Sequence, residues 1–412
     1  MGHLISTIKD VKQYINNYSG GHWGMKDPIT VEHRTSNAKR DYLFVNKAQC
    51  KHIPCSPSDL IDTCKGLADN VNFYISKEGC INSVLVVAFA ETATAIGNII
   101  ADCIDSEVYV MQTTRENVEN SVEVISFKEE HSHATDQKLL TYDDGSVDIN
   151  KFDMVLFVDD EISTGKTILN FIDAFEKEFN EKQYAVASIC NWMDEDARSV
   201  FYDRNIEVFA SNFGEIRDRE AKLLRSPNVV FRESSDYSSA VLKSDAGTLI
   251  HHNCEKELVQ PDVFRRSRLG HKPGEDIQKL LERIDEDLKA SDAQSVRIVG
   301  TEEFMYIPVM VAAGLEKLGY EVICHSTTRS PIDVMVDKKT GRPLDSPSTG
   351  IMYKASLRSV YDRNRKTYIY NTVEHTDATV IITDVEMDYD SKSEYYDLFI
   401  QTTDDLLMIN LK

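Results

Sequence analysis

The segment Met154–Thr167 constrains the fold of this chain most strongly, because it combines a buried strand, two acids, a small-residue turn and a helix start. Its first residues, Met154–Val158, are apolar without alternation, which is typical of a parallel strand covered on both faces. Ser163–Thr167 then opens a helix with an apolar stripe. Free backbone N–H groups and small hydroxyls at that helix start predict an anion site, most naturally one for phosphate.

Asp159 and Asp160 narrow the kind of ligand, because two carboxylates beside a phosphate repel it unless they bind something else. Vicinal sugar hydroxyls, a divalent cation, or both would fit. Phosphoribosyl diphosphate (PRPP) combines a 5-phosphate, a ribose diol and a metal-binding diphosphate, so one ligand meets every demand. The alternative is an ordinary strand-to-helix turn. A P-loop is excluded, because its first glycine would fall on Asp160.

This stretch also resembles the signature of the type I phosphoribosyltransferases, an apolar strand and two acids followed by Thr-Gly-x-Thr, over Val155–Thr167. The resemblance implies that Asp159 and Asp160 are catalytic residues that hold the ribose hydroxyls, with Mg²⁺ as the cofactor beside them. It also implies a 5-phosphate loop. This loop consists of Ser163, Thr164, Gly165, Lys166 and Thr167.

Composition excludes several classes of partner. The 412 residues carry 46 Lys and Arg against 68 Asp and Glu, a net charge of −22. Nucleic acid and anionic membranes both require a positive surface, so neither is expected as a partner. Without a signal pattern or an apolar run long enough to span a membrane, the protein is expected to be cytoplasmic. The eight scattered cysteines are expected to be mostly reduced thiols, and zinc at Cys50–Cys55 is not favoured.

The segment from residue 34 to residue 51 is dense in positive charge for so acidic a chain. We interpret it as a cap that meets phosphate or substrate, with a solvated basic loop as the alternative. The cap residues are Arg34, Lys39, Arg40 and Lys51.

A narrower resemblance rests on this basic segment, on Lys51–Pro54 and on Thr328-Arg329-Ser330-Pro331. Together they are similar to the phosphoribosyltransferases encoded in bacterial tellurite-resistance and stress operons. In that family an orotate phosphoribosyltransferase-like domain is followed by a C-terminal TRSP domain. The resemblance implies a role in stress response, other stress-operon proteins as partners, and a homodimer as one arrangement.

A second ligand loop is expected after the apolar strand Ser83–Ala88, where small residues let the backbone approach a ligand at a helix N-terminus. In the phosphoribosyltransferase fold, the loop at this position holds diphosphate. The assigned residues are Glu91, Thr92, Ala93 and Thr94. Glu91 is an awkward diphosphate contact unless it acts through metal or water.

Arg115 follows the next strand and is assigned to phosphate contact. A long polar insertion then precedes the central strand, and such insertions are often active-site lids. Within it, His131 and His133 are candidate catalytic residues, with an exposed polar hairpin as the alternative.

Alternating strands and helices over residues 83–210 predict an α/β fold, a doubly wound parallel sheet like that of type I phosphoribosyltransferases. We expect three parts. Residues 1–245 would form this domain with its cap, 246–290 a linker and helix, and 291–412 a TRSP-like α/β domain. The basic residues near 264–270 are either a surface feature or a contact to the substrate of one of the domains, and the sequence does not distinguish these two alternatives.

The second domain repeats the first in outline. Val296–Glu302 parallels Val86–Glu91, and the strand before Asp384 parallels the central strand without a following Thr-Gly-x-Thr. We interpret it as a degenerate copy that kept a pocket and lost the phosphoribosyl cradle. Chance similarity of two α/β units is the alternative, and different strand orders would exclude the repeat. The pocket residues are Glu302, Thr327, Thr328 and Arg329.

These features favour a Mg²⁺-dependent phosphoribosyltransferase that uses PRPP and an unidentified base, nucleotide or small-molecule acceptor, in either direction. The alternative is a non-catalytic sensor that binds PRPP or a nucleotide. The sequence does not indicate the acceptor.

Overall fold

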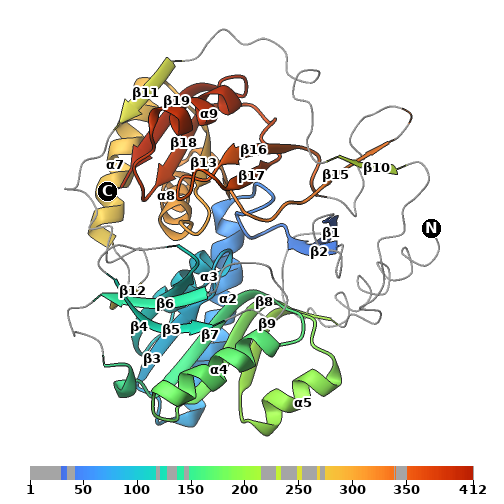
Figure 1. Cartoon of the computed structure of the whole chain (residues 1–412). Coiled ribbons are helices and arrows are strands. Elements are labelled where there is room, and N and C mark those ends of the chain that lie inside the picture. The colour runs from blue at the N-terminus through green and yellow to red at the C-terminus, as the bar shows by residue number, and fades with distance from the viewer. Residues whose placement is uncertain are drawn as a thin grey trace.

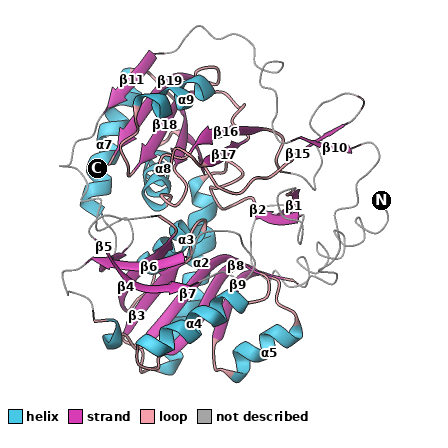
Figure 2. Ribbon diagram, in the orientation of Figure 1, coloured by secondary structure: helices cyan, strands magenta, loops and turns pink. Residues whose placement is uncertain are grey.

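The computed structural model describes two α/β domains, which lie one above the other in Figure 1. The described residues are 29–34, 42–116, 121–127, 137–142, 148–214, 229–232, 248–252, 267–269, 274–337, 339 and 350–411. Helices α2 and α3 of the first domain face the second domain (Figure 2). No helix in these ranges is long and apolar enough to cross a membrane.

The first domain is built on a sheet with strand order β5-β6-β4-β3-β7-β8-β9. The strands are β3 (Ser83–Ala88), β4 (Glu107–Thr114), β5 (Ser121–Phe127), β6 (Gln137–Tyr142), β7 (Met154–Ile162), β8 (Gln183–Asn191) and β9 (Glu207–Phe213). The run β4-β3-β7-β8-β9 is parallel, while β5 and β6 extend the β4 edge as an antiparallel hairpin. The predicted doubly wound parallel sheet is confirmed.

Helices cover both faces of this sheet. They are α2 (Pro57–Glu78), α3 (Ala93–Asp102), α4 (Lys166–Glu178) and α5 (Glu195–Asp203). Along β7, Leu156 and Val158 pack toward α2 and α3, while Val155 and Phe157 pack toward α4. Because β7 is buried on both faces, its apolar residues do not alternate with polar ones.

The second domain has a five-stranded sheet, order β11-β19-β18-β13-β14, in which all neighbours are parallel. Its strands are β11 (Thr248–His252), β13 (Ser295–Gly300), β14 (Glu321–Ser326), β18 (Thr376–Thr383) and β19 (Thr403–Asn410). Its helices are α7 (Gly274–Ala290), α8 (Tyr306–Leu318) and α9 (Tyr389–Phe399).

Short antiparallel pairs join the parts of the chain. They are β1 (Ile29–His33) with β2 (Tyr42–Asn46), β10 (Val229–Arg232) with β15 (Val334–Asp337), and β16 (Lys354–Arg358) with β17 (Lys366–Tyr370). The N-terminal pair touches both domains, because Phe44 packs on Trp192 while His33 Nδ1 lies 2.8 Å from Asp333 Oδ2. Strand β12 (Ser267–Leu269), from the basic segment before α7, pairs with β4.

The two sheets share a strand order. The order β4-β3-β7-β8 corresponds to β14-β13-β18-β19, that is, 2-1-3-4 in both domains. The inner strands begin at Ser83 and Ser295, whose backbone N–H groups donate to Asp153 and Asp377, and Val87 and Val299 each lie four residues beyond these serines. The two valines are therefore equivalent, and they pair with Met111 and Phe157 and with His325 and Ile381, respectively. The repeat hypothesis therefore passes the strand-order comparison that could have excluded it. The same order is common among doubly wound folds and does not by itself establish common descent.

The domains share one continuous hydrophobic core. Ile96 and Ile99 of α3 belong to the same buried cluster as Ile307 and Val309 of α8. At its edge, the Tyr306 hydroxyl donates a 2.5 Å hydrogen bond to Asp102. The carboxyl ends of the β3 and β13 strands consequently approach one another.

Candidate active site

The predicted ligand loops lie side by side at the carboxyl ends of β3 and β7, which are neighbours in the sheet. Asp159 and Asp160 still belong to β7, which continues pairing with β8 to Ile162. Helix α4 begins at Lys166, so the turn between strand and helix is only Ser163–Gly165. Two distant sequence segments thus meet at one edge, as parallel strands require.

The acid pair is half-buried and held in a defined geometry. The backbone N–H of Asp160 donates a 2.9 Å hydrogen bond to Asp159 Oδ1. Burial, followed by repulsion from Glu161, raises the pKa of Asp160 above its ordinary value. A cation or hydroxyl donors placed here would therefore relieve an existing electrostatic cost.

The turn after the acids closes through Gly165, which has a left-handed φ of +73°. A Cβ at this position would lie 2.4 Å from Phe201 Cε2 and 2.8 Å from Met193 Sδ. Gly165 is therefore required both for its backbone angle and for lack of space. It lets the first amides of α4 face the turn, which is the geometry of a phosphate-binding helix start.

The second loop is anchored to the sheet by main-chain contacts. Phe89 N–H donates to the Val158 carbonyl at 2.9 Å, and Ala90 N–H donates to Thr113 Oγ1 at 2.8 Å. The peptide bond between Ala90 and Glu91 is cis. Helix α3 begins at Ala93, directly after Thr92, so Glu91–Thr94 stands at a helix N-terminus as the sequence indicated.

Glu91 points into contacts with residues from outside the first sheet. Its Oε1 pairs with Lys51 Nζ, and its Oε2 accepts a 3.3 Å hydrogen bond from the backbone N–H of Arg329. Burial alone would raise its pKa, but Lys51 and Arg329 lower the pKa of Glu91 to about 2. The carboxylate therefore remains charged at physiological pH.

Lys51, predicted as part of a substrate cap, is fully buried. In addition to Glu91, its Nζ donates a 2.6 Å hydrogen bond to the main-chain oxygen of Glu302. Lys51 therefore bridges the ligand loop of the first domain and the equivalent region of the second.

Arg115 and Thr114 hold a carboxylate of the second domain. The Thr114 hydroxyl donates to Glu303 Oε2 at 2.7 Å, and the Arg115 backbone N–H donates to Glu303 Oε1 at 3.1 Å. Thr94 Oγ1 donates to the Glu303 main-chain oxygen at 2.8 Å. Arg115 was assigned to phosphate contact from the sequence. Its backbone N–H is already used in a hydrogen bond within the protein.

The predicted second-domain residues do come together at the ends of β13 and β14. Glu302, at a left-handed φ of 49°, is fully buried and accepts from Arg329 Nε at 2.8 Å. Its backbone N–H donates to Thr327 Oγ1 at 3.1 Å, and Thr328 pairs through its backbone with Tyr368. Burial raises the pKa of Glu302, an effect that Arg329 partly offsets.

Residues absent from the sequence prediction complete this group. Arg365 lies 2.9 Å from Glu302 Oε2 and 2.7 Å from Glu116 Oε1, and Arg329 also pairs with Glu116 and Glu303. We call Lys51, Glu91, Glu116, Glu302, Glu303, Arg329 and Arg365 the interdomain charge cluster. The two adjacent acids Glu302 and Glu303 can be recognised in the sequence, but only the structure shows that arginines 329 and 365 are their partners.

The second domain carries carboxylates at the positions where the first has its predicted phosphate loop. Asp384 occupies the position of Asp160 and accepts a 2.6 Å hydrogen bond from the Tyr361 hydroxyl. Beyond it, Asp388 caps α9 by accepting from Ser391 N–H at 2.8 Å. An anion therefore already stands at this helix start, as expected of a copy that lost the cradle.

Other predicted residues lie elsewhere or outside the described parts of the chain. Arg34 is half-buried directly after β1. Lys39, Arg40, His131 and His133 fall outside the described residues, as does most of the predicted lid loop. The seven cysteines in the described residues are free thiols, with Cys50 Sγ 3.3 Å from Cys55 Sγ.

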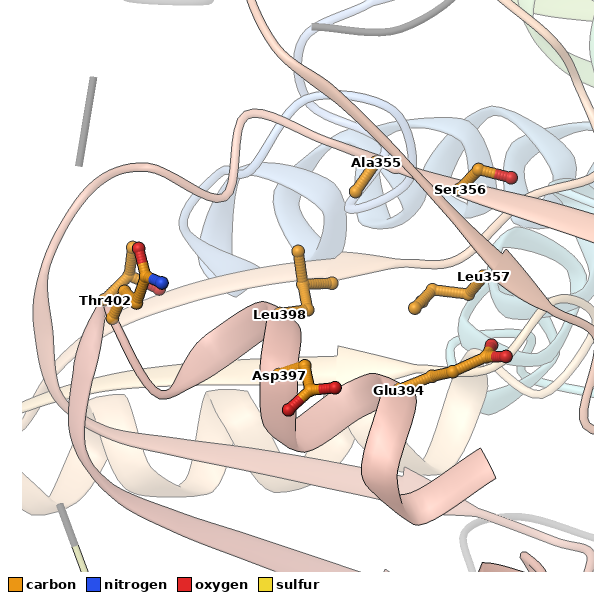
Figure 3. Close-up of a pocket in the computed structure, with 8 residues that line it drawn as sticks. Ala355, Ser356, Leu357, Glu394, Asp397, Leu398 and Thr402 are labelled. Atoms are coloured by element: carbon orange, nitrogen blue, oxygen red, sulfur yellow. The ribbon is translucent and has the colours of Figure 1, made fainter. Parts of the chain in front are cut away.

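A separate hollow of about 280 Å³ lies between β16 and α9 (Figure 3). Leu357 and Leu398 line it together with the acids Glu394 and Asp397. Glu394 is already paired with Arg358 at 2.9 Å. The hollow shares no residue with the ligand loops of the first domain.

The fold defines a phosphoribosyltransferase-like α/β domain that is followed by a second α/β domain with the same strand order. Residues 30–210 match the family model described as "Phosphoribosyl transferase", and residues 266–400 match the model described as "TRSP domain C terminus to PRTase_2". The chain belongs to this family of phosphoribosyl transferase domains followed by a TRSP domain, which confirms the resemblance seen in the sequence.

Solved structures with a similar fold include adenine phosphoribosyltransferases. That of Trypanosoma brucei is 13% identical, with 49% of this chain and 83% of that chain covered and a TM-score of 0.32. That of Rhodothermus marinus is 16% identical, with 50% and 98% covered and a TM-score of 0.33. No functionally curated protein matches the sequence.

Proposed function

We propose that this protein is a Mg²⁺-dependent phosphoribosyltransferase that exchanges the 5-phosphoribosyl group between PRPP and a base or other small acceptor. The observation that carries the proposal is the constellation at the end of β7. Half-buried Asp159 and Asp160 stand one short turn from the N-terminus of α4. Few ligands other than a phosphorylated ribose need both groups so close together.

The donor set suits a hard divalent cation that is shared with its ligand. Carboxylate oxygens are the ligands Mg²⁺ prefers, and it usually retains water and substrate oxygens as well. Among the described residues, Asp159 and Asp160 do not belong to any group of three protein ligands close enough for one ion. When bound with PRPP, Mg²⁺ would neutralise charge on the departing diphosphate.

Residues of the protein itself would bind the ribose and the phosphate groups of PRPP. Asp159 and Asp160 would orient the ribose through its hydroxyls, and the turn Ser163–Gly165 with the first amides of α4 would hold the 5-phosphate. Breaking the anomeric C–O bond places positive charge on the sugar and negative charge on the diphosphate. Amides at the start of α3, which begins at Ala93, would stabilise the negative charge that develops on the diphosphate.

A second candidate function is a sensor that binds PRPP or a nucleotide without turnover. It is favoured by one observation, the contact of Glu91 in the diphosphate loop with Arg329 of the second domain. A ligand at this loop would act directly on that contact and so could signal to the second domain.

One experiment tests the proposal against this alternative. The protein is incubated with Mg²⁺, PRPP and a metabolite extract, while diphosphate release and new ribosylated species are followed by mass spectrometry. An enzyme releases diphosphate in many turnovers, whereas a sensor binds stoichiometrically without release. Asp159→Asn with Asp160→Asn should abolish both signals. Asp384→Asn, at the equivalent position in the second domain, is the matched control and should retain them.

A further inference from the structure

Glu91 and Glu303 are structural equivalents. Val87 and Val299 hold the same place in the two sheets, and each glutamate lies four residues beyond its valine. The residues Arg115 and Arg329 are equivalent in the same way, four residues beyond the strand partners of those valines. The sequence comparison had matched Glu91 with Glu302. The strand register instead matches Glu91 with Glu303.

These equivalent residues contact one another across the domain interface. Arg115 in the first domain donates its backbone N–H to Glu303, while Arg329 in the second donates its backbone N–H to Glu91. Each domain thus binds the loop glutamate of the other. Such reciprocal contacts between equivalent residues are the pattern of a two-fold symmetric pair.

The contacts of Glu91 with residues outside its own loop affect the net charge of the predicted diphosphate loop. Glu91 lies within Glu91–Thr94, and an uncompensated carboxylate there would oppose diphosphate binding. The two cations that form ion pairs with Glu91 are Lys51, which precedes α2, and Arg329, whose Nε lies 3.9 Å from Glu91 Oε2, while Arg115 also acts on the Glu91 carboxylate electrostatically. Both cations come from outside the loop and the strand that carries it.

We propose that Arg329 of the second domain is a positioning residue for the diphosphate end of the PRPP site, and that it acts through Glu91. Together with Lys51, it cancels and fixes the Glu91 carboxylate so that the amides at the start of α3 can receive an anion. This inference rests on the proposed function and assigns the second domain a part in the site of the first.

A double-mutant cycle measures the effect. Inorganic diphosphate with Mg²⁺, and separately PRPP with Mg²⁺, are titrated by calorimetry into the full-length protein, Arg329→Gln, Glu91→Gln and the double variant. Arg329→Gln should weaken diphosphate binding roughly tenfold or more, because a buried charge is left half-compensated. In the Glu91→Gln background the same substitution should change the affinity less than threefold.

Two further variants separate positioning from structural damage. Arg329→Lys keeps the positive charge and should recover most of the affinity lost in Arg329→Gln. Arg365→Gln removes a neighbouring arginine that binds Glu116 and Glu302, and it should leave diphosphate affinity unchanged although it perturbs the same interface. Thermal unfolding of each variant reports on the fold.

The outcomes distinguish this inference from the proposed function. If the wild type binds PRPP but Arg329→Gln binds diphosphate equally well, the inference is overturned and the function stands. Diphosphate binding that depends on Arg329, without any binding of PRPP, removes the proposed function and limits the inference to an anion site at the start of α3 that Arg329 controls. Should Arg329→Gln not fold, Glu91→Gln decides alone, since it must bind diphosphate at least as tightly as the wild type. A tenfold loss in that variant overturns the inference.

Discussion

The Glu303 carboxylate of the second domain accepts a 3.1 Å hydrogen bond from the backbone N–H of Arg115 in the first. Glu303 is fully buried and also pairs with Arg329 at 3.2 Å. The interface between the domains is therefore fixed by ionic contacts as well as by the apolar packing of α3 on α8. Because these contacts exclude water, each should matter more than a surface ion pair.

Replacing Glu303 by Ala should destabilise the protein by about 3 kcal/mol, because it leaves the Thr114 hydroxyl and the Arg115 backbone N–H without their buried acceptor and removes one of the carboxylates that face Arg329. Urea unfolding measures the change. Glu394→Ala, which removes an acid from a surface pair with Arg358, is the control and should cost less than about 1 kcal/mol. Equal losses in the two variants would show that the interdomain contact is no stronger than a surface pair.

The variant Asp159→Asn with Asp160→Asn should lose PRPP binding while its melting temperature stays unchanged or rises. The side chains would no longer bind hydroxyls or a cation, but the burial of a charged group and its repulsion from Glu161, which together raise the pKa of Asp160, would also disappear. Calorimetry with Mg²⁺ and PRPP, together with thermal unfolding, tests both halves. Unchanged Mg²⁺-dependent binding by the double variant would refute the assignment of the acid pair.

Mg²⁺ alone should bind weakly, and its affinity should rise at least tenfold when PRPP is present. The reason is that the two aspartates would need ligand oxygens to complete the coordination shell. Titration of Mg²⁺ with and without PRPP provides the comparison. Tight Mg²⁺ binding in the absence of PRPP would instead indicate a site formed by the protein alone.

Gly165→Ala should destabilise the protein by about 3 kcal/mol and weaken PRPP binding, because it adds a clash with Phe201 to the strain of a left-handed angle. Gly79→Ala is a matched control, since Gly79 has φ +65° with nothing within 4 Å of an added Cβ. It should cost about 1 kcal/mol from backbone strain alone and leave binding unchanged. A loss at Gly165 no larger than that at Gly79 would contradict close packing at the turn.

Glu32→Gln should stabilise the protein at pH 8 but not at pH 4. Burial, partly offset by a hydrogen bond from Gly350 N–H, raises the pKa of Glu32 to about 7 from its ordinary 4.5. The folded state therefore binds this proton more tightly than the unfolded state, and stability falls as pH rises from about 4.5 through 7.

The ionised carboxylate should cost up to about 3 kcal/mol above pH 7. Unfolding free energies of wild type and Glu32→Gln between pH 4 and 8 isolate this contribution, since other titrating groups are common to both proteins. If the free energies of unfolding of the two proteins change with pH in the same way, ionisation of Glu32 does not destabilise the folded protein.

The amino-acid sequence by itself determined the fold of the first domain and the strand ends at which we propose its ligand site. A non-alternating apolar run such as Met154–Val158 is typical of a strand in a parallel sheet that is covered on both faces, and such sheets bring their ligand loops to one edge. These are patterns of hydrophobicity and turn residues within short segments, so they can be recognised without knowing which distant residues are in contact.

Only the tertiary structure decided what surrounds Glu91. The partners Lys51 and Arg329 lie 40 residues before it and 238 residues after it in the chain, and no periodicity links positions so far apart. The register of the two sheets likewise matched Glu91 to Glu303, where spacing along the chain had suggested Glu302. Long-range electrostatic pairing depends on how the domains dock, and docking is set by the whole shared core of α3 and α8.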